Sequence, residues 1–357
     1  MKQNHNFFSN LAFNIAESNV GKTNKNPSVG CVIVKNNSVI SSGVTSINGR
    51  PHAEYNALSK NLNFKDAYMY VTLEPCTHYG ITPPCTNLIK KKRVKKVYYC
   101  FEDPDIRTYK KAKIVLNNRI KKIKKIDDRN KDFYKSYFFN KKYKLPFIDA
   151  KIAISKDFST ISKKNKWITN SRSRKVSHLI RSKYDCIIST SASINKDNSL
   201  LNCRINGLNN KKPDLIIIDR NLKLKRNLRL LKLAKKRKTY IFTTSRNKNK
   251  ISYFKKKKIN IIQINKLINE QDFFLLLKKI YKLGKTRVLV EAGPTFLKKL
   301  IMFNLINYLY IFKSNILLKK NGFKKFVSHC IKRCTKNNKV NVNLENDELF
   351  SIKLNNV

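Results

Sequence analysis

The sequence predicts two consecutive α/β domains, and three observations support this. The chain has 357 residues, of which 41% are hydrophobic, which is enough for more than one packed core. Short apolar runs alternate with segments whose apolar residues recur at helical spacing, a pattern typical of layered α/β domains. The basic stretch 141–145, followed by Pro146, interrupts this alternation. We therefore expect one domain over residues 1–145 and a second over residues 146–357.

The first domain begins with an amphipathic helix, because apolar residues between Phe7 and Ala16 recur at helical spacing. Two apolar runs then predict buried strands joined by a turn at Asn36 and Asn37. A helix starts near His52, and another runs through Leu88 and Ile89. The strands expected in this half are 29–34, 39–44, 68–73 and 94–99.

The second domain repeats the alternation of strands and helices. Helical patterns cover residues 171–182 and 272–283, and the basic tract 255–258 is typical of a turn or a helix end. The strands expected here are 147–154, 185–190, 215–219, 240–244, 260–264 and 287–291.

The chain is strongly basic, with 77 Lys and Arg against 22 Asp and Glu and a formal net charge of +55. Such an excess favours nucleic-acid binding when it is gathered on one face. Here lysines occur in every segment, while Gly and Pro are rare at 9 each, as in the proteins of AT-rich genomes. We therefore interpret the charge as a solvated surface without a dedicated nucleic-acid partner, whose self-repulsion weakens the fold.

Two absences indicate the compartment. The sequence holds no apolar run long enough to span a membrane, and residues 1–18 lack the unbroken apolar core of a signal peptide. The eight cysteines are too sparse for a disulfide framework. We expect a cytoplasmic protein with reduced thiols and no membrane partner.

The clearest chemical signal is His52 followed by Cys76 and Cys85. One imidazole and two thiolates suit zinc, and three protein ligands leave a fourth position for water, which is typical of a catalytic site. Zinc lowers the pKa of such a water towards neutrality. Glu54, two residues after His52, could then transfer protons to a leaving nitrogen, so the pattern predicts hydrolytic deamination. The alternative is a histidine at a helix start beside two buried thiols.

The remaining cysteines that we considered indicate no chemistry. Cys31 and Cys100 lie in apolar strands, where a free cysteine packs as a small hydrophobe. Cys330 and Cys334 stand near His329, but a fourth ligand is missing nearby. We interpret this pair as structural.

The segment 75–85, with the sequence PCTHYGITPPC, resembles the signature of bifunctional riboflavin-biosynthesis deaminase-reductases, and so does NPSVGCVIV at 26–34. The eight residues between the two cysteines differ from the two found in cytidine, cytosine and transfer-RNA deaminases. The resemblance implies a cytidine-deaminase-like α/β/α sandwich, with Asn26 in the substrate pocket.

The second half resembles the reductase of the same family, which has a dihydrofolate-reductase-like α/β fold. The matching pieces are 151–157, 167–169, Arg181, 197–204 and 291–295, and the two resemblances together cover about residues 5–325. They imply zinc and NADPH as cofactors, a pyrimidine ribose-phosphate substrate and a homo-oligomer formed through the reductase domain. The implied NADPH contacts are Ile154, Trp167, Ser193, Asp197, Gly293, Pro294 and Thr295, and the implied substrate contacts in this half are Asn165, Arg181, Leu201, Arg204 and Glu291.

The residues themselves agree with this assignment. The expected strand 287–291 leads into a Gly293-Pro294 turn and a helix, and amides at a helix start can bind a phosphate. Arg181 and Arg204 could hold a ribose phosphate through paired hydrogen bonds. Taken alone, however, a Gly-Pro turn more often serves only as a turn.

The chain departs from the family pattern mainly in the second half. Phe158 replaces a glycine, Asn165 replaces a serine, and Asn198-Ser199 replaces Asp-Pro. In the first half, residues 105–109 lack a pair of glycines. Three hypotheses follow: deamination and then NADPH-dependent reduction of the ribosyl to a ribityl chain, a deaminase with a non-catalytic reductase domain, or an RNA-editing deaminase. We favour the first.

Overall fold

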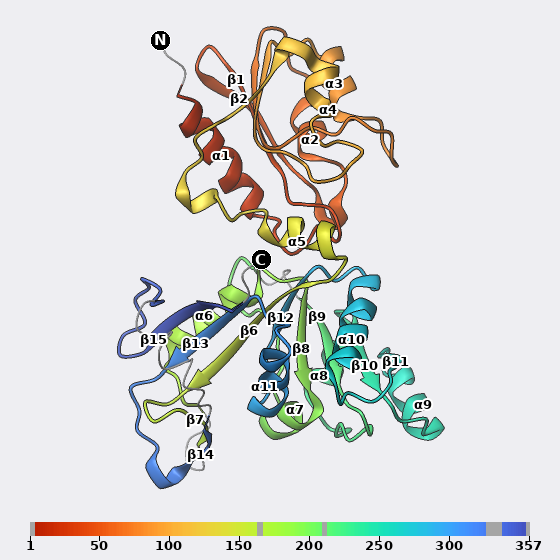
Figure 1. Ribbon diagram of the computed structural model, residues 1–357, viewed down its shortest axis with the longest axis vertical. Helices are drawn as coiled ribbons and strands as arrows, with labels where there is room; N and C mark the ends of the chain where they lie inside the picture. The colour runs from red at the N-terminus through yellow and green to blue at the C-terminus, as the bar shows by residue number, and fades with distance from the viewer. Residues whose placement is uncertain (1–3, 163–166, 209–212, 326–337, 355–357) are drawn as a thin grey trace. The chain divides into compact units, whose positions relative to one another are not determined.

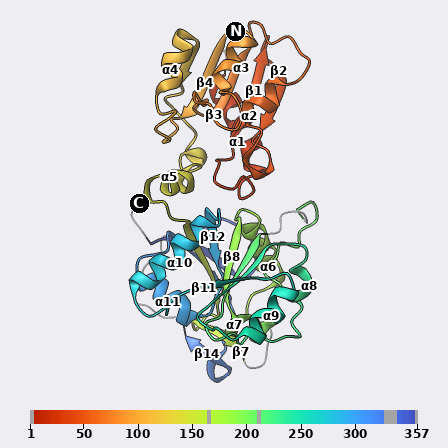
Figure 2. The same cartoon turned by 90° about the vertical axis from the view of Figure 1, so that its right-hand side faces the viewer.

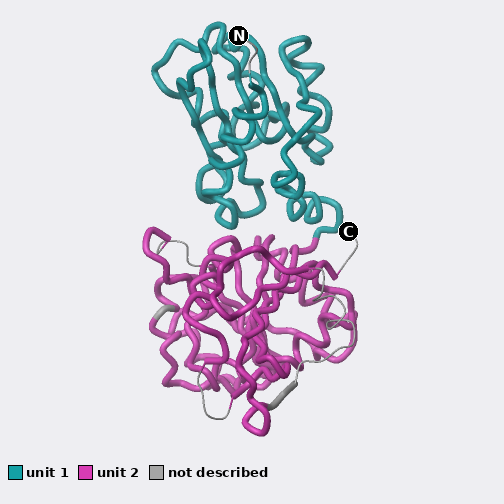
Figure 3. Tube along the Cα trace, turned by 90° about the vertical axis from the view of Figure 1, so that its left-hand side faces the viewer, with its two compact units in different colours: residues 1–144 teal, residues 145–357 magenta. Residues whose placement is uncertain are grey.

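Two units divide the chain, residues 1–144 and 145–357 (Figure 3). The computed structural model describes residues 4–162, 167–208, 213–325 and 338–354. Each unit contains its own sheet and its own hydrophobic clusters. Among the described residues, every helix is too short or too polar to span a lipid bilayer.

Unit 1 is built on a five-stranded sheet with the order β2-β1-β3-β4-β5 (Figure 1). The strand β1 pairs antiparallel with β2 and β3, whereas β4 and β5 continue the sheet in parallel. Asn36 and Asn37 form the β1–β2 turn with φ of 50° and 60°, a left-handed conformation that Asn tolerates well. The strands are β1 (Gly30–Lys35), β2 (Ser38–Val44), β3 (Tyr68–Leu73), β4 (Lys96–Phe101) and β5 (Ile120–Lys122).

Helices cover both faces of this sheet, and two glycines show how closely they approach. A Cβ atom on Gly30 would lie 1.9 Å from the carbonyl oxygen of Ala12 in α1, and one on Gly43 would lie 2.3 Å from that of Ala53 in α2. Gly43 pairs with Cys31, the neighbour of Gly30, so the two glycines face opposite sides. This arrangement is the predicted α/β/α sandwich. The helices are α1 (His5–Glu17), α2 (Ala53–Leu58), α3 (Cys85–Lys91), α4 (Lys111–Leu116) and α5 (Lys135–Tyr143).

Unit 2 contains a sheet of eight strands in the order β11-β10-β9-β8-β12-β6-β13-β15. Neighbouring strands are parallel except at the β13–β15 edge, and β7 and β14 form a separate antiparallel pair. The strands are β6 (Phe147–Ile154), β7 (Ser159–Ser162), β8 (Cys186–Thr190), β9 (Asp214–Ile218), β10 (Thr239–Thr243), β11 (Asn260–Gln263), β12 (Arg287–Val290), β13 (Tyr308–Lys313), β14 (Gly322–Lys325) and β15 (Glu348–Lys353).

The two faces of the large sheet pack against different helices (Figure 2). On β8, Ile188 contributes to the cluster that includes residues of α10 and α11, whereas its neighbour Ile187 contributes to the cluster with residues of α7, α8 and α9. This alternation places helices on both sides of a mostly parallel sheet. The helices are α6 (Ser171–Arg181), α7 (Ser191–Asp197), α8 (Leu230–Leu233), α9 (Lys248–Lys256), α10 (Glu270–Lys282) and α11 (Pro294–Met302).

The predicted strands and helices are present with shifts of at most two residues at most boundaries, and the tract 255–258 begins inside the last turn of α9. Elements that the sequence did not predict include α5, β5 and β13, together with β15 and the β7–β14 pair. Several of these are short or lie at an edge of a sheet, where the apolar pattern is weak.

Candidate active sites

The predicted metal ligands come together in unit 1. His52 is the N-cap of α2, Cys76 follows β3, and Cys85 is the first residue of α3. Their ligand atoms lie within 4.8 Å of one another, and His52 Nδ1 is 3.7 Å from Cys76 Sγ and 3.5 Å from Cys85 Sγ. Zinc bonds of usual length in a tetrahedron place nitrogen and sulfur ligands about 3.6 Å apart. The cluster therefore fits zinc in both donor type and spacing.

The surroundings of Cys76 favour its thiolate form. The Cys85 backbone N–H donates to Cys76 Sγ over 3.3 Å. A hydrogen bond from the Cys85 thiol lowers the pKa of Cys76 most, and His52 adds to this effect despite burial, so that the pKa falls to about 4. Because metals bind the thiolate, this environment prepares the sulfur for a metal ion.

Glu54 lies in the first turn of α2, directly beside the cluster, and is buried at 4% exposure. Burial raises the pKa of its carboxyl group to about 7, an effect that His52 partly opposes. A carboxyl group at this position can both accept and donate a proton near neutral pH.

Asn26 is hydrogen-bonded to Gly49, in the segment that leads to His52. Its side-chain amide donates to the carbonyl of Gly49 over 2.8 Å, and Thr23 donates to the Asn26 carbonyl over 2.7 Å. Gly49 has φ of 91°, a conformation suited to glycine. The predicted pocket residue is thus joined to the segment that carries the metal ligand.

Three side chains that sequence reasoning missed stabilise the loop between the two cysteines and the neighbouring segment 103–112. Arg50 donates to Thr82 Oγ1 over 2.6 Å, and His78 lies 3.1 Å from Thr108 Oγ1. Glu74 accepts backbone N–H groups from Asp103, Lys110 and Ala112 at 3.1–3.3 Å. An acidic residue directly before Pro75-Cys76 was the available sequence signal for Glu74, whereas the other two contacts depend on the fold.

In unit 2, Arg181 and Glu291 form a two-pronged ion pair. Arg181 Nε and Nη2 donate to the two carboxylate oxygens over 2.5 and 2.8 Å. Burial raises the pKa of Glu291, but Arg181 and Lys151 lower it further, to about 2. The Lys151 ammonium lies 3.8 Å from the same carboxylate. Arg181 and Glu291, both predicted to contact the substrate, therefore fix each other's side-chain position.

His178, which the sequence did not single out, connects this pair to the segment with Leu201 and Arg204. Its Nδ1 lies 2.8 Å from the Asn202 carbonyl, and Arg181 Nη1 donates to the same carbonyl over 3.2 Å. Burial, together with Arg181 and Arg204, lowers the pKa of His178 to about 4. Leu201 is buried, and the Arg204 guanidinium donates to Asn202 Oδ1 over 2.9 Å.

Part of the predicted cofactor set also converges. Ser193 Oγ accepts the Gly293 N–H over 3.0 Å, and Ser189 donates to the Glu291 carbonyl over 2.7 Å. Gly293 is the N-cap of α11 and Pro294 has no N–H, so the amides left for an anion begin at Thr295.

The other predicted residues of this half are placed separately. Ile154 is buried at the end of β6, and Asp197 ends α7. Trp167 is 53% exposed and lies under the guanidinium of Arg174 at 5.1 Å. Asn165, like His329, Cys330 and Cys334, lies outside the described residues.

Two departures from the family pattern take left-handed backbone conformations. Phe158 has φ of 64° at the position of the missing glycine, and its ring packs against the core and near Lys313. Asn198 has φ of 45°, which Asn tolerates, and accepts the Arg229 N–H. At Phe158 the left-handed conformation is strained, whereas at Asn198 it is tolerated.

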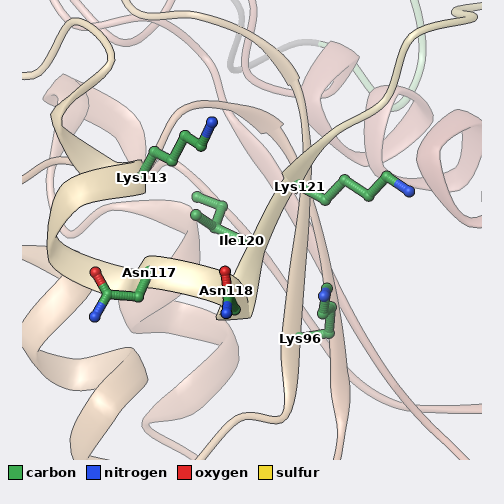
Figure 4. Close-up of a pocket in the computed structure, with 6 residues that line it drawn as sticks. All are labelled: Lys96, Lys113, Asn117, Asn118, Ile120 and Lys121. Carbon is green, nitrogen blue, oxygen red and sulfur yellow. The ribbon is translucent and has the colours of Figure 1, made fainter.

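A hollow in unit 1 contains none of the predicted site residues. It is lined by Lys96, Lys113, Asn117, Asn118, Ile120 and Lys121 (Figure 4). Surface lysines and amides of this kind provide no acid, base or metal ligand for the predicted chemistry.

Comparisons with known proteins assign both halves. The cytidine and deoxycytidylate deaminase zinc-binding region matches residues 2–101, and the RibD C-terminal domain matches residues 146–324. Riboflavin biosynthesis protein RibD of Actinobacillus pleuropneumoniae is 32% identical over 80% of this chain and 76% of its own length. The RibD protein of Aquifex aeolicus is 31% identical over 80% of each chain.

Solved structures agree over the whole chain. The fold is similar to that of Acinetobacter baumannii RibD, with a TM-score of 0.82, 24% identity and coverage of 98% of this chain and 99% of that one. A deaminase-reductase from Thermotoga maritima gives a TM-score of 0.81 at 25% identity, with the same coverage. The zinc-binding deaminase domain and the NADPH-using reductase domain stand in one polypeptide, and the chain belongs to the RibD family of bifunctional deaminase-reductases of riboflavin biosynthesis.

Proposed function

We propose that unit 1 removes an amino group from 2,5-diamino-6-ribosylamino-4(3H)-pyrimidinone 5′-phosphate and that unit 2 reduces the ribosyl group of the product. The observation that carries the first step is the convergence of His52, Cys76 and Cys85 beside the buried carboxyl group of Glu54. The similar protein from Thermotoga maritima is a phosphoribosylaminopyrimidine deaminase and a phosphoribosylamino-uracil reductase, which supports this substrate class.

Zinc would be held by His52, Cys76 and Cys85, and Glu54 would transfer protons as general base and acid. Zinc, when bound in such a site, supplies a Lewis acid that makes a water molecule acidic enough to react near neutral pH. Glu54 takes up a proton at one carboxylate oxygen and passes it to the amino nitrogen that leaves as ammonia, while the ring carbon gains a carbonyl oxygen. Arg50 and His78 keep the loop between the cysteines in place through Thr82 and Thr108, and Glu74 holds the backbone of residues 103–112 beside it.

For the second step, we assign the phosphate of the substrate mainly to Arg204. Arg181 already uses Nε and Nη2 on Glu291, whereas Arg204 is exposed at the surface. NADPH, when bound, supplies the hydride. Ser193 fixes the Gly293 turn, so that the helix start from Thr295 onward can face a cofactor phosphate.

The decisive experiment is product analysis of the purified protein with the diaminopyrimidine substrate, with and without NADPH. We expect ammonia release without NADPH and a ribityl product with it. Chelation should stop ammonia release but leave reduction of the deaminated compound intact. Deamination that survives complete zinc removal would contradict the first assignment, and absence of NADPH oxidation with the deaminated compound would contradict the second.

The proposed function also includes the oligomeric state and the cellular compartment of the protein. The family resemblance supports a homo-oligomer formed through the reductase unit, working in the cytoplasm. Light scattering of the full chain after size-exclusion chromatography measures the assembly, and a monomer at micromolar concentration would contradict it. Fractionation of cells that express the protein tests the compartment.

A further inference from the structure

Arg237 is a buried cation whose hydrogen bonds within the described residues all end on backbone carbonyls. It lies just before β10 and is 8% exposed. Its Nη1 donates to the carbonyls of Leu201 and Pro213 over 2.6 and 3.2 Å, and its Nη2 donates to that of Leu200 over 2.5 Å. Its Nε is buried without a hydrogen-bond partner in the described part of the chain. Burying a charge in this way is costly, so an apolar residue would be expected here if packing were the only requirement.

The segment that Arg237 contacts is strained. Leu201 is buried and has φ of 48°, a left-handed conformation that is unfavourable for a leucine by about 1–2 kcal/mol. Such strain persists only where the surroundings hold the backbone in place. Arg237 supplies this restraint directly, because two of its hydrogen bonds end on the carbonyls of Leu200 and Leu201.

The same segment is held at its next residue by the groups of the substrate site. The Asn202 carbonyl accepts from Arg181 and lies 2.8 Å from His178 Nδ1, and the Arg204 N–H lies 3.3 Å from the same ring nitrogen. Arg237 therefore fixes residues 200–201, and the end of α6 fixes residues 202–204. Arg204, the residue assigned to the substrate phosphate, is the last residue of the segment held in this way.

We infer that Arg237 is a positioning residue of the reductase site, which holds residues 200–201 so that Arg204, three residues further on, meets the ribose-phosphate end of the substrate. This inference rests on the proposed reductase function. Arg237 does not touch the substrate, and its effect is exerted through the backbone of the segment. Its loss should therefore weaken substrate binding, while NADPH binding and deamination remain unchanged.

The test compares Arg237→Met and Arg237→Lys with Arg287→Met as a matched control. Arg287 also has a buried Nε without a hydrogen-bond partner among the described residues, but its guanidinium lies over the ring of Tyr184. Initial rates of NADPH oxidation with the deaminated substrate give KM and kcat, and amide hydrogen exchange reports on residues 199–204. We expect Arg237→Met to raise the KM for the substrate about tenfold and to speed exchange in this segment. Arg237→Lys, which keeps the charge but reaches fewer carbonyls, should recover part of both effects.

Arg287→Met should lower the melting temperature without changing the KM for the substrate. An unchanged KM and unchanged exchange in Arg237→Met would overturn the inference, and so would an equal rise in KM in the control. If Arg237→Met does not fold, Arg237→Lys alone decides, because an unchanged KM and unchanged exchange would then overturn the inference. If the wild-type protein fails to oxidise NADPH, the proposed reductase function is wrong and the positioning role falls with it, whereas amide exchange at residues 199–204 still decides whether Arg237 restrains this segment.

Discussion

Arg181 and Glu291 join the last residue of α6 to the residue that follows β12 through two parallel hydrogen bonds. Both side chains are largely removed from solvent, with side-chain exposures of 13% and 8%. A paired guanidinium and carboxylate offset each other's desolvation only while both are present. Loss of either residue should therefore disturb the predicted substrate site and also lower the stability of unit 2.

Replacing Glu291 with Gln should destabilise unit 2 by about 3–5 kcal/mol, because Arg181 would remain buried without its counter-charge. The chain has a single tryptophan, Trp167 in unit 2, so its fluorescence during urea unfolding reports on this unit. Glu348→Gln is the control, because its pair with Lys339 is exposed and should be worth less than about 1 kcal/mol. An equal loss of unfolding free energy in both variants would show that the Arg181–Glu291 pair stabilises unit 2 no more than the exposed Lys339–Glu348 pair.

Unit 2 should lose stability as the pH falls from 6.5 to 4, because of His178. Its pKa is lowered from 6.5 to about 4 by burial and by Arg181 and Arg204, with Glu291 and the Asn202 carbonyl also facing it. The unfolded chain binds a proton in this window and the folded chain does not, so stability rises with pH there and falls by about 3 kcal/mol as the pH drops through it.

The same unfolding measurement at a series of pH values checks this effect. His178→Gln should flatten the slope between pH 6.5 and 4. Glu291, whose pKa is lowered from 4.5 to about 2, contributes stability that is present above pH 4.5 and is lost only below it. A slope that is unchanged in His178→Gln would assign the acid sensitivity to other groups.

Replacing Glu54 with Gln should lower the rate of deamination by about 10²–10⁴-fold, because the amide cannot transfer protons. Zinc content, measured by atomic emission, should stay near that of the wild type, since His52, Cys76 and Cys85 are unchanged. Reduction of the deaminated compound by NADPH serves as the internal control and should be unaffected. Rapid ammonia release by this variant would remove Glu54 from the mechanism.

Two substitutions at Phe158 can distinguish the cost of backbone strain from the contribution of side-chain packing. Phe158→Ala removes the ring but keeps a Cβ atom at φ of 64°, whereas Phe158→Gly removes the strain as well. The Gly variant should therefore be about 1 kcal/mol more stable than the Ala variant. Thermal unfolding of the two variants measures this difference, and a more stable Ala variant would mean that the turn does not retain its left-handed conformation.

The parts of the protein that follow from local pattern were predictable. Strand β3 and strand β6 match their predicted ranges, because both are rich in apolar, aromatic and β-branched residues, although β6 also contains Asp149 and Lys151. The metal cluster was also predictable, since His52, Cys76 and Cys85 belong to a short list of residues that bind zinc. The roles of individual site residues remain predictions.

The contacts that hold the second site depend on atoms that the sequence does not distinguish. His178 and Arg237 act on backbone carbonyls of residues 200–202, and any residue type provides a carbonyl. Among 77 basic residues, nothing local marks Arg237 as buried. The antiparallel strand β15 was also missed, because its short run Glu348–Lys353 mixes apolar and polar residues at the edge of the sheet.

The close approach at Gly43 also governs chemistry. The helix α2 carries His52 at its start and Glu54 in its first turn, and its backbone rests almost directly on the sheet at this glycine. A single methyl group there would push the helix outward and pull the imidazole away from the two sulfurs, which are anchored on other elements. The absence of a side chain at Gly43, which takes no part in the reaction, thus determines how closely His52 can approach Cys76 and Cys85.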